Sequence, residues 1–498
     1  MRTRGIGAML ATIVLAVSAC ATTTASEDTA SAKPQELTVA GFYPIVTLDP
    51  HGPQADAGTS TAGTQIYSRL VRLKDGKYQP DLATRWTASP DAKTWTFTMR
   101  DKVKFSDGSP LGPEDVVASI QRVTRLAGPQ AASWKDITAT VSGSNQVVLT
   151  AAKPDASVLG KLTLLWITPA KRSDEAGFFN QPVGSGPFKV QSYTASQTLV
   201  LVPNDQYWGE KPKLTKLTMT TIPDISARVT ALRTGEIQAT WGIPDDQITQ
   251  VRSESGITVK SVPSLAVYTM WMNSSRPALA DAKVRKAIWQ AVDFQSIISS
   301  LYPDTGKVAD SPVPPGVPGY ARQPAVKYDP DAAKTALQDA GFDFGQTLQL
   351  QFSGAEFRQF TQAVASDLAK IGVKVEPKEK EKAVFLQDLL GMNWDINLQS
   401  LALDTGDLAS NLGRLYTCAA KRTGYCDPDL DKLLTEAGSI SDPDRRADLY
   451  GQAQKIIWRE AVGMYPMFLN ISYAWRDNVH GFQTSPAYQP DFSKVTVS

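Results

Sequence analysis

The pattern of apolar and polar positions switches between strand-like and helix-like many times along the chain. Residues 95–100 alternate apolar and polar side chains, as a half-buried strand does. Short apolar runs at 147–149 and 199–202 are typical of further strands, whereas residues 284–292 repeat apolar side chains at helical spacing. This mixture predicts an α/β protein.

Proline in the first turn marks the start of several predicted helices. The Asp-Pro pairs at 329–330, 427–428 and 442–443 each place an acidic cap before a proline at the first helical position. Residues 113–120 begin with proline and carry acids in the first turn. We expect Gly341 to end the first of the Asp-Pro helices.

The first residues of the chain have the order of an export signal. Arg2 and Arg4 precede an uncharged apolar run at 6–17, and two small residues then lead to Cys20. The run is shorter than the roughly 20 residues of a membrane-spanning helix. A cysteine after small residues resembles the lipobox of bacterial lipoproteins. We predict that residues 1–19 are a signal peptide and that a lipid on Cys20 anchors the exported protein outside the cytoplasmic membrane. The alternative is an ordinary signal peptide with an incidental cysteine.

The residues after the predicted cleavage point are small and polar. Residues 20–36 lack apolar periodicity and are expected to form a flexible tether. No second apolar run approaches spanning length. The chain has 498 residues, which is long for a single core, so we expect two or three domains.

Charge and histidine content limit the chemistry. The 51 basic and 50 acidic side chains nearly cancel, so no basic excess indicates a nucleic-acid partner. The two histidines, His51 and His480, are too few for a histidine metal cluster. Neither lies in a recognisable catalytic setting, and we expect no cofactor and no catalysis.

Three cysteines remain to be explained in an exported protein. Cys20 is assigned to the lipid, which leaves Cys418 and Cys426. A disulfide between them is expected in an oxidising compartment, and two free thiols are the alternative.

Several motifs follow one another in an order that resembles a known family, the extracellular solute-binding proteins of family 5, found in peptide and nickel importers. Each motif is weak alone, but together they span nearly the whole chain after the tether. Glycines 184 and 186 in one of them are expected to allow tight turns. The matching stretches are 78–86, 94–100, 103–116, 183–188, 204–209, 284–293, 328–330 and 340–342.

The resemblance implies a two-lobed, periplasmic-binding-protein-like fold of type II (cluster C). Lobe one would comprise residues 37–265 and 475–498, with an extra subdomain at 66–180, and lobe two residues 266–474. Ligand closes such lobes by hinge motion. The family further implies a monomer that delivers a peptide to the permease and ATPase subunits of an ABC importer.

A bound peptide carries an ammonium group, which needs a carboxylate partner in a closed cleft. Peptide-binding members of the family have an aspartate that meets this group, and Asp404 matches its position. The alternative is that Asp404 caps a turn. We expect Asp407 to be a cap or a supporting group.

Two positions depart from the pattern of the family. A tryptophan beside the ligand is replaced by Leu401, and an arginine that meets the carboxylate of dipeptides is replaced by Gln351. The nearby Arg358 is expected on a helix. A peptide longer than a dipeptide, with its carboxylate left in water, therefore fits better.

Three further residues are candidates for either ligand contact or structure. Trp271 and Asn273 lie on the expected crossing segment between the lobes, and Tyr43 lies after the first strand. Rival functions also stay open at this point. They are an oligosaccharide, nickel-chelate or haem receptor with the same fold, a sensor or adhesion protein without an importer, and an envelope hydrolase using Asp404 and Asp407.

Overall fold

The computed structural model describes residues 35–498. The predicted signal peptide, Cys20 and most of the predicted tether lie outside the described residues. Within 35–498, no helix is both long and apolar enough to cross a membrane.

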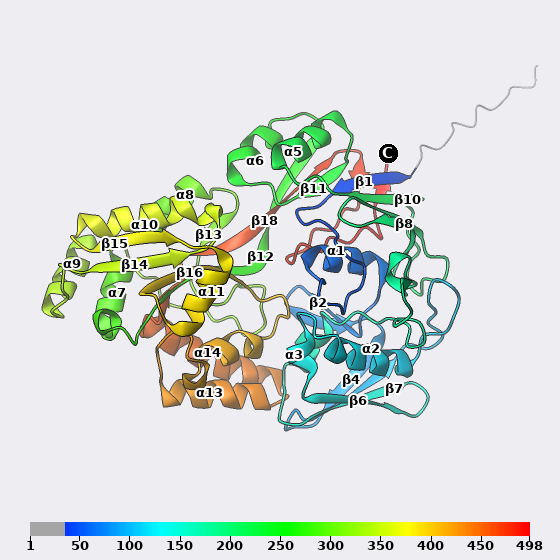
Figure 1. The fold of residues 1–498 in the computed structure, drawn as a ribbon, viewed down its shortest axis with the longest axis horizontal. Helices are drawn as coiled ribbons and strands as arrows, with labels where there is room; N and C mark the ends of the chain where they lie inside the picture. Colours follow the sequence, from blue (N-terminus) through cyan, green and yellow to red (C-terminus); the bar gives the residue numbers. More distant parts are fainter. Residues whose placement is uncertain (1–34) are drawn as a thin grey trace, which may run out of the picture. The chain divides into compact units, whose positions relative to one another are not determined.

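The main structural element is a 12-stranded sheet with the order β15-β14-β16-β12-β18-β11-β1-β10-β9-β8, to which β13 and β17 add at β18 and β12 (Figure 1). Its strands are β1 Glu36–Ala40, β8 Phe188–Thr194, β9 Thr198–Pro203, β10 Lys216–Thr220, β11 Ala239–Trp241, β12 Ile257–Met272, β13 Gly306–Val308, β14 Thr347–Phe352, β15 Lys374–Glu379, β16 Ile396–Ala402, β17 Gly463–Met464 and β18 Met467–Arg476.

Two long strands connect the two halves of this sheet. β12 pairs antiparallel with β18, from Ile257 opposite Arg476 to Val267 opposite Phe468. On its other edge, β18 pairs with β11, and the C-terminal part of β12 pairs with β16. The register shifts once, between Pro263 and Val267. The chain therefore passes between the halves along a paired ribbon.

Each half of the sheet buries its own apolar side chains. One cluster contains residues between 265 and 468 and fills lobe two. A second joins residues between 37 and 241 with residues between 471 and 495, and belongs to lobe one. Separate cores joined by two strands are what a two-lobed receptor needs to move its lobes as units.

A third apolar cluster, between residues 70 and 167, belongs to an extra subdomain inside lobe one. Its sheet has the order β4-β5-β7-β6, and α2 packs on β6 and β7. The predicted strand at 95–100 is β5, and Trp95 on it is buried. The elements here are β2 Val71–Lys74, β3 Lys77–Pro80, β4 Ala83–Ala88, β5 Thr94–Met99, β6 Ile137–Ser142, β7 Gln146–Ala151, α2 Pro113–Arg125, α3 Ala131–Trp134 and α4 Val158–Leu162.

The predicted helix starts are confirmed. Asp329, Asp427 and Asp442 each accept a hydrogen bond from a backbone N–H in the first turn of the helix that follows. The remaining elements are α1 Ala57–Ile66, α5 Ile225–Thr234, α6 Asp245–Arg252, α7 Ala282–Gln290, α8 Phe294–Leu301, α9 Pro330–Asp339, α10 Arg358–Lys370, α11 Lys382–Gly391, α12 Leu412–Leu415, α13 Pro428–Ser439, α14 Pro443–Arg459, β19 Val479–His480, β20 Thr496–Val497 and the short 3₁₀ turns η1 Phe178–Asn180, η2 Pro277–Leu279, η3 Ala355–Phe357, η4 Leu408–Ser410 and η5 Cys418–Ala420.

Glycines 184 and 186 have a different role from the one predicted. Neither has a positive φ, so no turn requires them for conformational freedom. A Cβ atom on Gly184 would lie 2.0 Å from the carbonyl oxygen of Ile66 at the end of α1. The N–H of Gly186 donates to the same oxygen at 2.9 Å. Glycine is needed here because two backbones touch.

Candidate functional site

Asp404 lies on a tight turn at the end of β16. The N–H of Gly406 donates to the carbonyl of Leu403 at 2.8 Å, and the N–H of Leu403 donates to Leu265 on β12 at 2.8 Å. Gly406 has a φ of +63°, and a Cβ atom there would lie 2.6 Å from Leu73 of the subdomain. The turn therefore holds Asp404 where lobe two meets the subdomain.

The Asp404 carboxylate has no compensating partner among residues 35–498. Its side chain is open to solvent, yet the protein around it desolvates the charge, which raises the pKa of Asp404. No hydrogen bond or cation offsets this cost. A carboxylate in this state favours a cationic partner, because a positive group nearby would recover the lost solvation energy.

Two neighbouring cavities meet at Asp404. One has a volume of about 410 Å³ and the other about 330 Å³. Each falls within the range of small-ligand pockets, roughly 300–1,000 Å³. Their walls come from lobe one, the subdomain, lobe two and the C-terminal segment 483–491, so they form one cleft. The residues that line both cavities are Leu164, Asp404, Ala487 and Gln489.

A group of aromatic rings lies near Asp404, beside residues 487 and 489 that line the cleft. Tyr43 packs edge-on against Phe42 with ring centroids 4.6 Å apart, and its ring lies 5.9 Å from that of Tyr488. Burial and then the negative charge of Asp404 raise the pKa of Tyr43. Burial, Tyr43 and Asp404 raise the pKa of Tyr488 to about 12. Tyr43, a candidate from the sequence, is thus brought together with Asp404.

Asp407, three residues farther along the chain, is paired inside the protein. Its carboxylate accepts from Arg446 of α14 at 2.8 Å and from the N–H of Ala409 at 2.8 Å, which caps η4. The side chain is almost completely buried. All of its charge is therefore used inside the protein, and Asp407 is a support of the turn rather than a ligand contact.

Trp271 and Asn273 do not reach the cleft. Trp271 is 1% exposed and donates from Nε1 to the hydroxyl of Tyr416 at 2.9 Å. Asn273 is 0% exposed, donates to the carbonyl of Trp394 at 2.9 Å and accepts from Ser275. Both side chains are satisfied inside lobe two. We therefore assign them to the core of lobe two and not to the ligand site.

The two departures from the family pattern also lie in lobe two. Leu401 is half-buried against the lobe-two core. Gln351 on β14 is buried, and neither of its amide atoms has a hydrogen-bond partner. Arg358 begins α10 and pairs with Glu379 at 2.5 Å. Gln351 is uncharged and Arg358 is paired, so neither residue supplies a free positive charge for the carboxylate of a peptide.

Cations do line the cleft on the lobe-one side. Arg72 is paired with Asp81 at 3.0 Å. Arg69 lies over the ring of Trp166 at 4.0 Å and donates to the carbonyl of Thr163 at 2.6 Å. Lys74 is exposed at the same cavity. Asp75 and Asp491 line the same cavity, so a ligand held by Asp404 would meet both cations and carboxylates farther along it.

The C-terminal contribution to the cleft was not predicted from the sequence. Tyr488 has a φ of +57°, and its carbonyl accepts from Thr61 of α1 at 3.0 Å. The segment 483–491 shows no periodicity that indicates an element. The only available signal is an aromatic residue between two nearby prolines in S-P-A-Y-Q-P at 485–490.

The remaining candidates lie apart from the centre of the cleft. Cys418 and Cys426 are joined by a disulfide, with their Cα atoms 4.5 Å apart. His51 is buried at the smaller cavity, with Nε2 2.9 Å from the carbonyl oxygen of Trp166. Burial and the charge of Arg122 lower the pKa of His51 to about 4. Within 35–498, no three His, Cys, Asp or Glu side chains gather in a way that could hold a metal ion.

The sequence model of the bacterial extracellular solute-binding proteins, family 5 (middle), matches residues 77–423. The chain belongs to this family. The two-lobed fold class expected from the motifs is confirmed, because solved structures of two-lobed solute-binding proteins superpose on nearly the whole of this chain.

Three relatives illustrate the match. A protein of Escherichia coli named "Probable D,D-dipeptide-binding periplasmic protein DdpA" is 31% identical, over 91% of this chain and 92% of its own length. The structure of HbpA2 from Haemophilus parasuis has a TM-score of 0.84 at 25% identity, over 93% of this chain and 100% of that one. The periplasmic binding protein DppA from Helicobacter pylori, in complex with the peptide STSA, has a TM-score of 0.74 at 25% identity, over 93% and 98%.

Proposed function

We propose that this family 5 protein captures peptides in the cleft between its lobes and delivers them to an ABC importer. The observation that carries the proposal is the uncompensated carboxylate of Asp404 at the junction of two cavities. A peptide ammonium is a cation of matching size and charge, and in an enclosed cleft such a pair is stronger than in water.

The surroundings of Asp404 support an ammonium further. The rings of Phe42, Tyr43 and Tyr488 lie close together near Asp404, and aromatic rings attract cations through their faces. A neutral sugar would stack on these rings but would leave Asp404 without a positive partner. A peptide ligand would therefore use both the carboxylate and the aromatic rings, whereas an oligosaccharide would use the rings alone.

The relatives agree with this class of ligand. The Escherichia coli relative is named for a dipeptide, and the Helicobacter pylori structure contains the peptide STSA. Because Lys74 and Arg69 line the larger cavity, the other end of the ligand has positive charge within the same cleft. A peptide of more than two residues, with its carboxylate toward this side or in water, is the proposed ligand.

The setting of the receptor belongs to the same proposal. A lipid on Cys20 would hold a monomeric, non-catalytic receptor at the outer face of the cytoplasmic membrane, beside the permease and ATPase subunits that it supplies. Residues between Cys20 and β1 would act as the tether. A tethered receptor stays at a high effective concentration near its importer.

The test is a calorimetric titration of the exported protein with trialanine and with N-acetyl-trialanine. Asp404→Asn should weaken trialanine binding by about 2–5 kcal/mol, because it removes one partner of a desolvated ion pair. Acetylation of the peptide should weaken binding to the unchanged protein by a similar amount.

Asp75→Asn is the matched control, since Asp75 lines the same larger cavity on an exposed turn. Its affinity for trialanine should stay unchanged. An Asp404→Asn protein with full affinity for trialanine would remove the ammonium site from the proposal. Native mass spectrometry of protein taken from cells should release a mixture of peptides, and a sugar or metal complex in its place would overturn the peptide assignment.

A further inference from the structure

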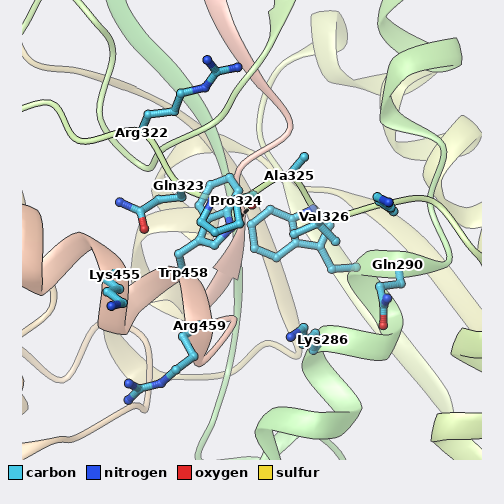
Figure 2. A pocket seen from close by; sticks show the side chains of 12 residues that line it. Lys286, Gln290, Arg322, Gln323, Pro324, Ala325, Val326, Lys455, Trp458 and Arg459 are labelled. Atoms are coloured by element: carbon cyan, nitrogen blue, oxygen red, sulfur yellow. Dashed lines mark hydrogen bonds between the residues drawn. The ribbon is translucent and has the colours of Figure 1, made fainter.

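A second pocket, here called the basic pocket, lies on lobe two away from the cleft. Its walls are the last turn of α7, the last turn of α14 and the segment 322–327 (Figure 2). Its volume is about 600 Å³. None of its lining residues lines either cleft cavity. The ligand site described above therefore does not account for it.

The walls of the basic pocket are held by buried hydrogen bonds. Arg285 of α7 is 1% exposed and donates to the carbonyls of Glu460 at 2.7 Å and Ala461 at 3.0 Å, just past the end of α14. Trp458 of α14 donates from Nε1 to the carbonyl of Pro324 at 2.9 Å. The three walls are thus fixed to one another before any ligand arrives.

The floor is apolar and aromatic. The rings of Trp289 and Trp458, which are only 5% and 8% exposed, pack edge to face with centroids 4.6 Å apart. Pro324, Ala325 and Val326 complete the apolar lining. Figure 2 shows Trp458 at the centre of the pocket, between Arg322 on one side and Lys286 and Arg459 on the other. Such a floor favours a flat or apolar ligand body.

The rim is basic and contains no acidic side chain. Two of its cations are already paired, Arg322 with Asp310 at 3.1 Å and Arg459 with Glu460 at 2.8 Å. The three lysines have no ion-pair partner among residues 35–498, and all are exposed. The five basic residues of the rim are Lys286, Arg322, Lys327, Lys455 and Arg459.

Helix ends explain only part of this charge. The C-termini of α7 and α14 each carry about half a negative charge, which cations in the last turn stabilise. Together with Asp310 and Glu460, these ends offset about three of the five positive charges. About two positive charges are left around a concave apolar floor.

We propose that the basic pocket binds a small organic anion whose ring or apolar body lies on the apolar floor made by Pro324, Ala325 and Val326 together with the edges of Trp289 and Trp458. Its carboxylate or phosphate groups would pair with Lys286, Lys327 and Lys455 at the rim. The pocket is concave and of small-ligand size, which a flat membrane surface would not fill. Since none of these residues lines the cleft, the anion would be a second ligand of this receptor.

The experiment is a calorimetric titration of the exported protein with benzene-1,3,5-tricarboxylate, a ring that carries carboxylates, and with citrate, which has carboxylates but no ring. The tricarboxylate should bind at one site with a Kd below about 1 mM at low salt. Citrate should bind more weakly because it leaves the aromatic floor uncovered.

The double variant Lys286→Gln/Lys455→Gln should weaken binding of the tricarboxylate about tenfold. The matched control is Lys283→Gln, which removes a lysine from the same helix outside the pocket and should leave binding unchanged. Equal weakening by the control, or the absence of saturable binding, would overturn the proposal. So would binding to phosphatidylglycerol vesicles through the same two lysines without any binding of the tricarboxylate.

Discussion

The cleft at Asp404 and the basic pocket on lobe two carry unpaired charges of opposite sign. In the cleft, a carboxylate lacks a partner, and aromatic rings lie beside it. In the basic pocket, lysines lack partners and surround two indoles. Both regions also contain charges of the same kind that are paired, Asp407 in the first and Arg459 in the second. Pairing, rather than the presence of charge, separates the groups that are free to bind ligand from those that support the fold.

The largest expected effect tests this distinction within one turn. Asp407→Asn leaves Arg446 buried without its carboxylate and should lower the free energy of unfolding by about 3–5 kcal/mol. Asp404→Asn removes no internal partner and relieves the cost of desolvating the charge, so it should not lower the free energy of unfolding. Urea denaturation measures both. Equal losses of stability would show that the two aspartates do not differ as described.

A smaller effect is the pH dependence that His51, in the wall of the cleft, should give to the free energy of unfolding. The basic pocket contains no group that titrates in the same pH range. The pKa of His51 is lowered to about 4 by burial, whereas unfolded histidine titrates near 6.5. Between these values the unfolded chain binds the proton and the folded protein does not. The free energy of unfolding should therefore fall by about 3 kcal/mol as the pH drops from 6.5 to 4.

Urea denaturation at several pH values, with His51→Gln as the comparison, measures this contribution. The variant should lose the part of the pH dependence that His51 supplies, and an unchanged dependence would exclude His51 as its source. Lysines and arginines do not titrate in this range. The charge of the rim should therefore stay constant over these pH values, and any weaker binding of the tricarboxylate toward pH 4 would come from protonation of the ligand's own carboxylates.

The smallest effect is that of salt. Raising the ionic strength from 0.1 to 1 M shortens the screening length from about 10 to about 3 Å. The exposed lysines of the basic pocket should lose a few-fold in affinity for the tricarboxylate, because they attract it through water. Binding of trialanine at Asp404 should fall less, since protein surrounds that pair. Parallel titrations compare the salt dependence of tricarboxylate binding with that of trialanine binding. A stronger salt dependence for trialanine would contradict the conclusion that the lysines of the basic pocket are the more exposed charges.

Much of the fold was predictable because its signals are local. The acidic caps Asp329, Asp427 and Asp442 lie next to the helices that they start. The alternation at 95–100 lies within one strand, and the motif order identified the family. Asp404 was found through that family pattern, and its turn requires only the neighbouring Gly406.

The rest of the site was not predictable from neighbouring residues. Tyr488 of the C-terminal segment packs beside Tyr43, although hundreds of positions separate the two residues in the chain. Trp271 lies on a crossing strand, but its side chain points to Tyr416 inside lobe two. Alternation along a strand shows that faces differ, yet which face another segment covers depends on the packing of the whole lobe.

The sequence by itself determined the class of the protein, its strands and helix starts, and the position of an aspartate that suits an ammonium. Only the tertiary structure decided which charges are free. Asp404 and Asp407 lie only three positions apart in the chain, but Arg446 of α14 neutralises Asp407 alone. The basic pocket likewise combines α7, α14 and the segment 322–327. Helix and strand propensities act between neighbours in the chain, whereas charge pairing and burial act between neighbours in space, and folding alone brings these together.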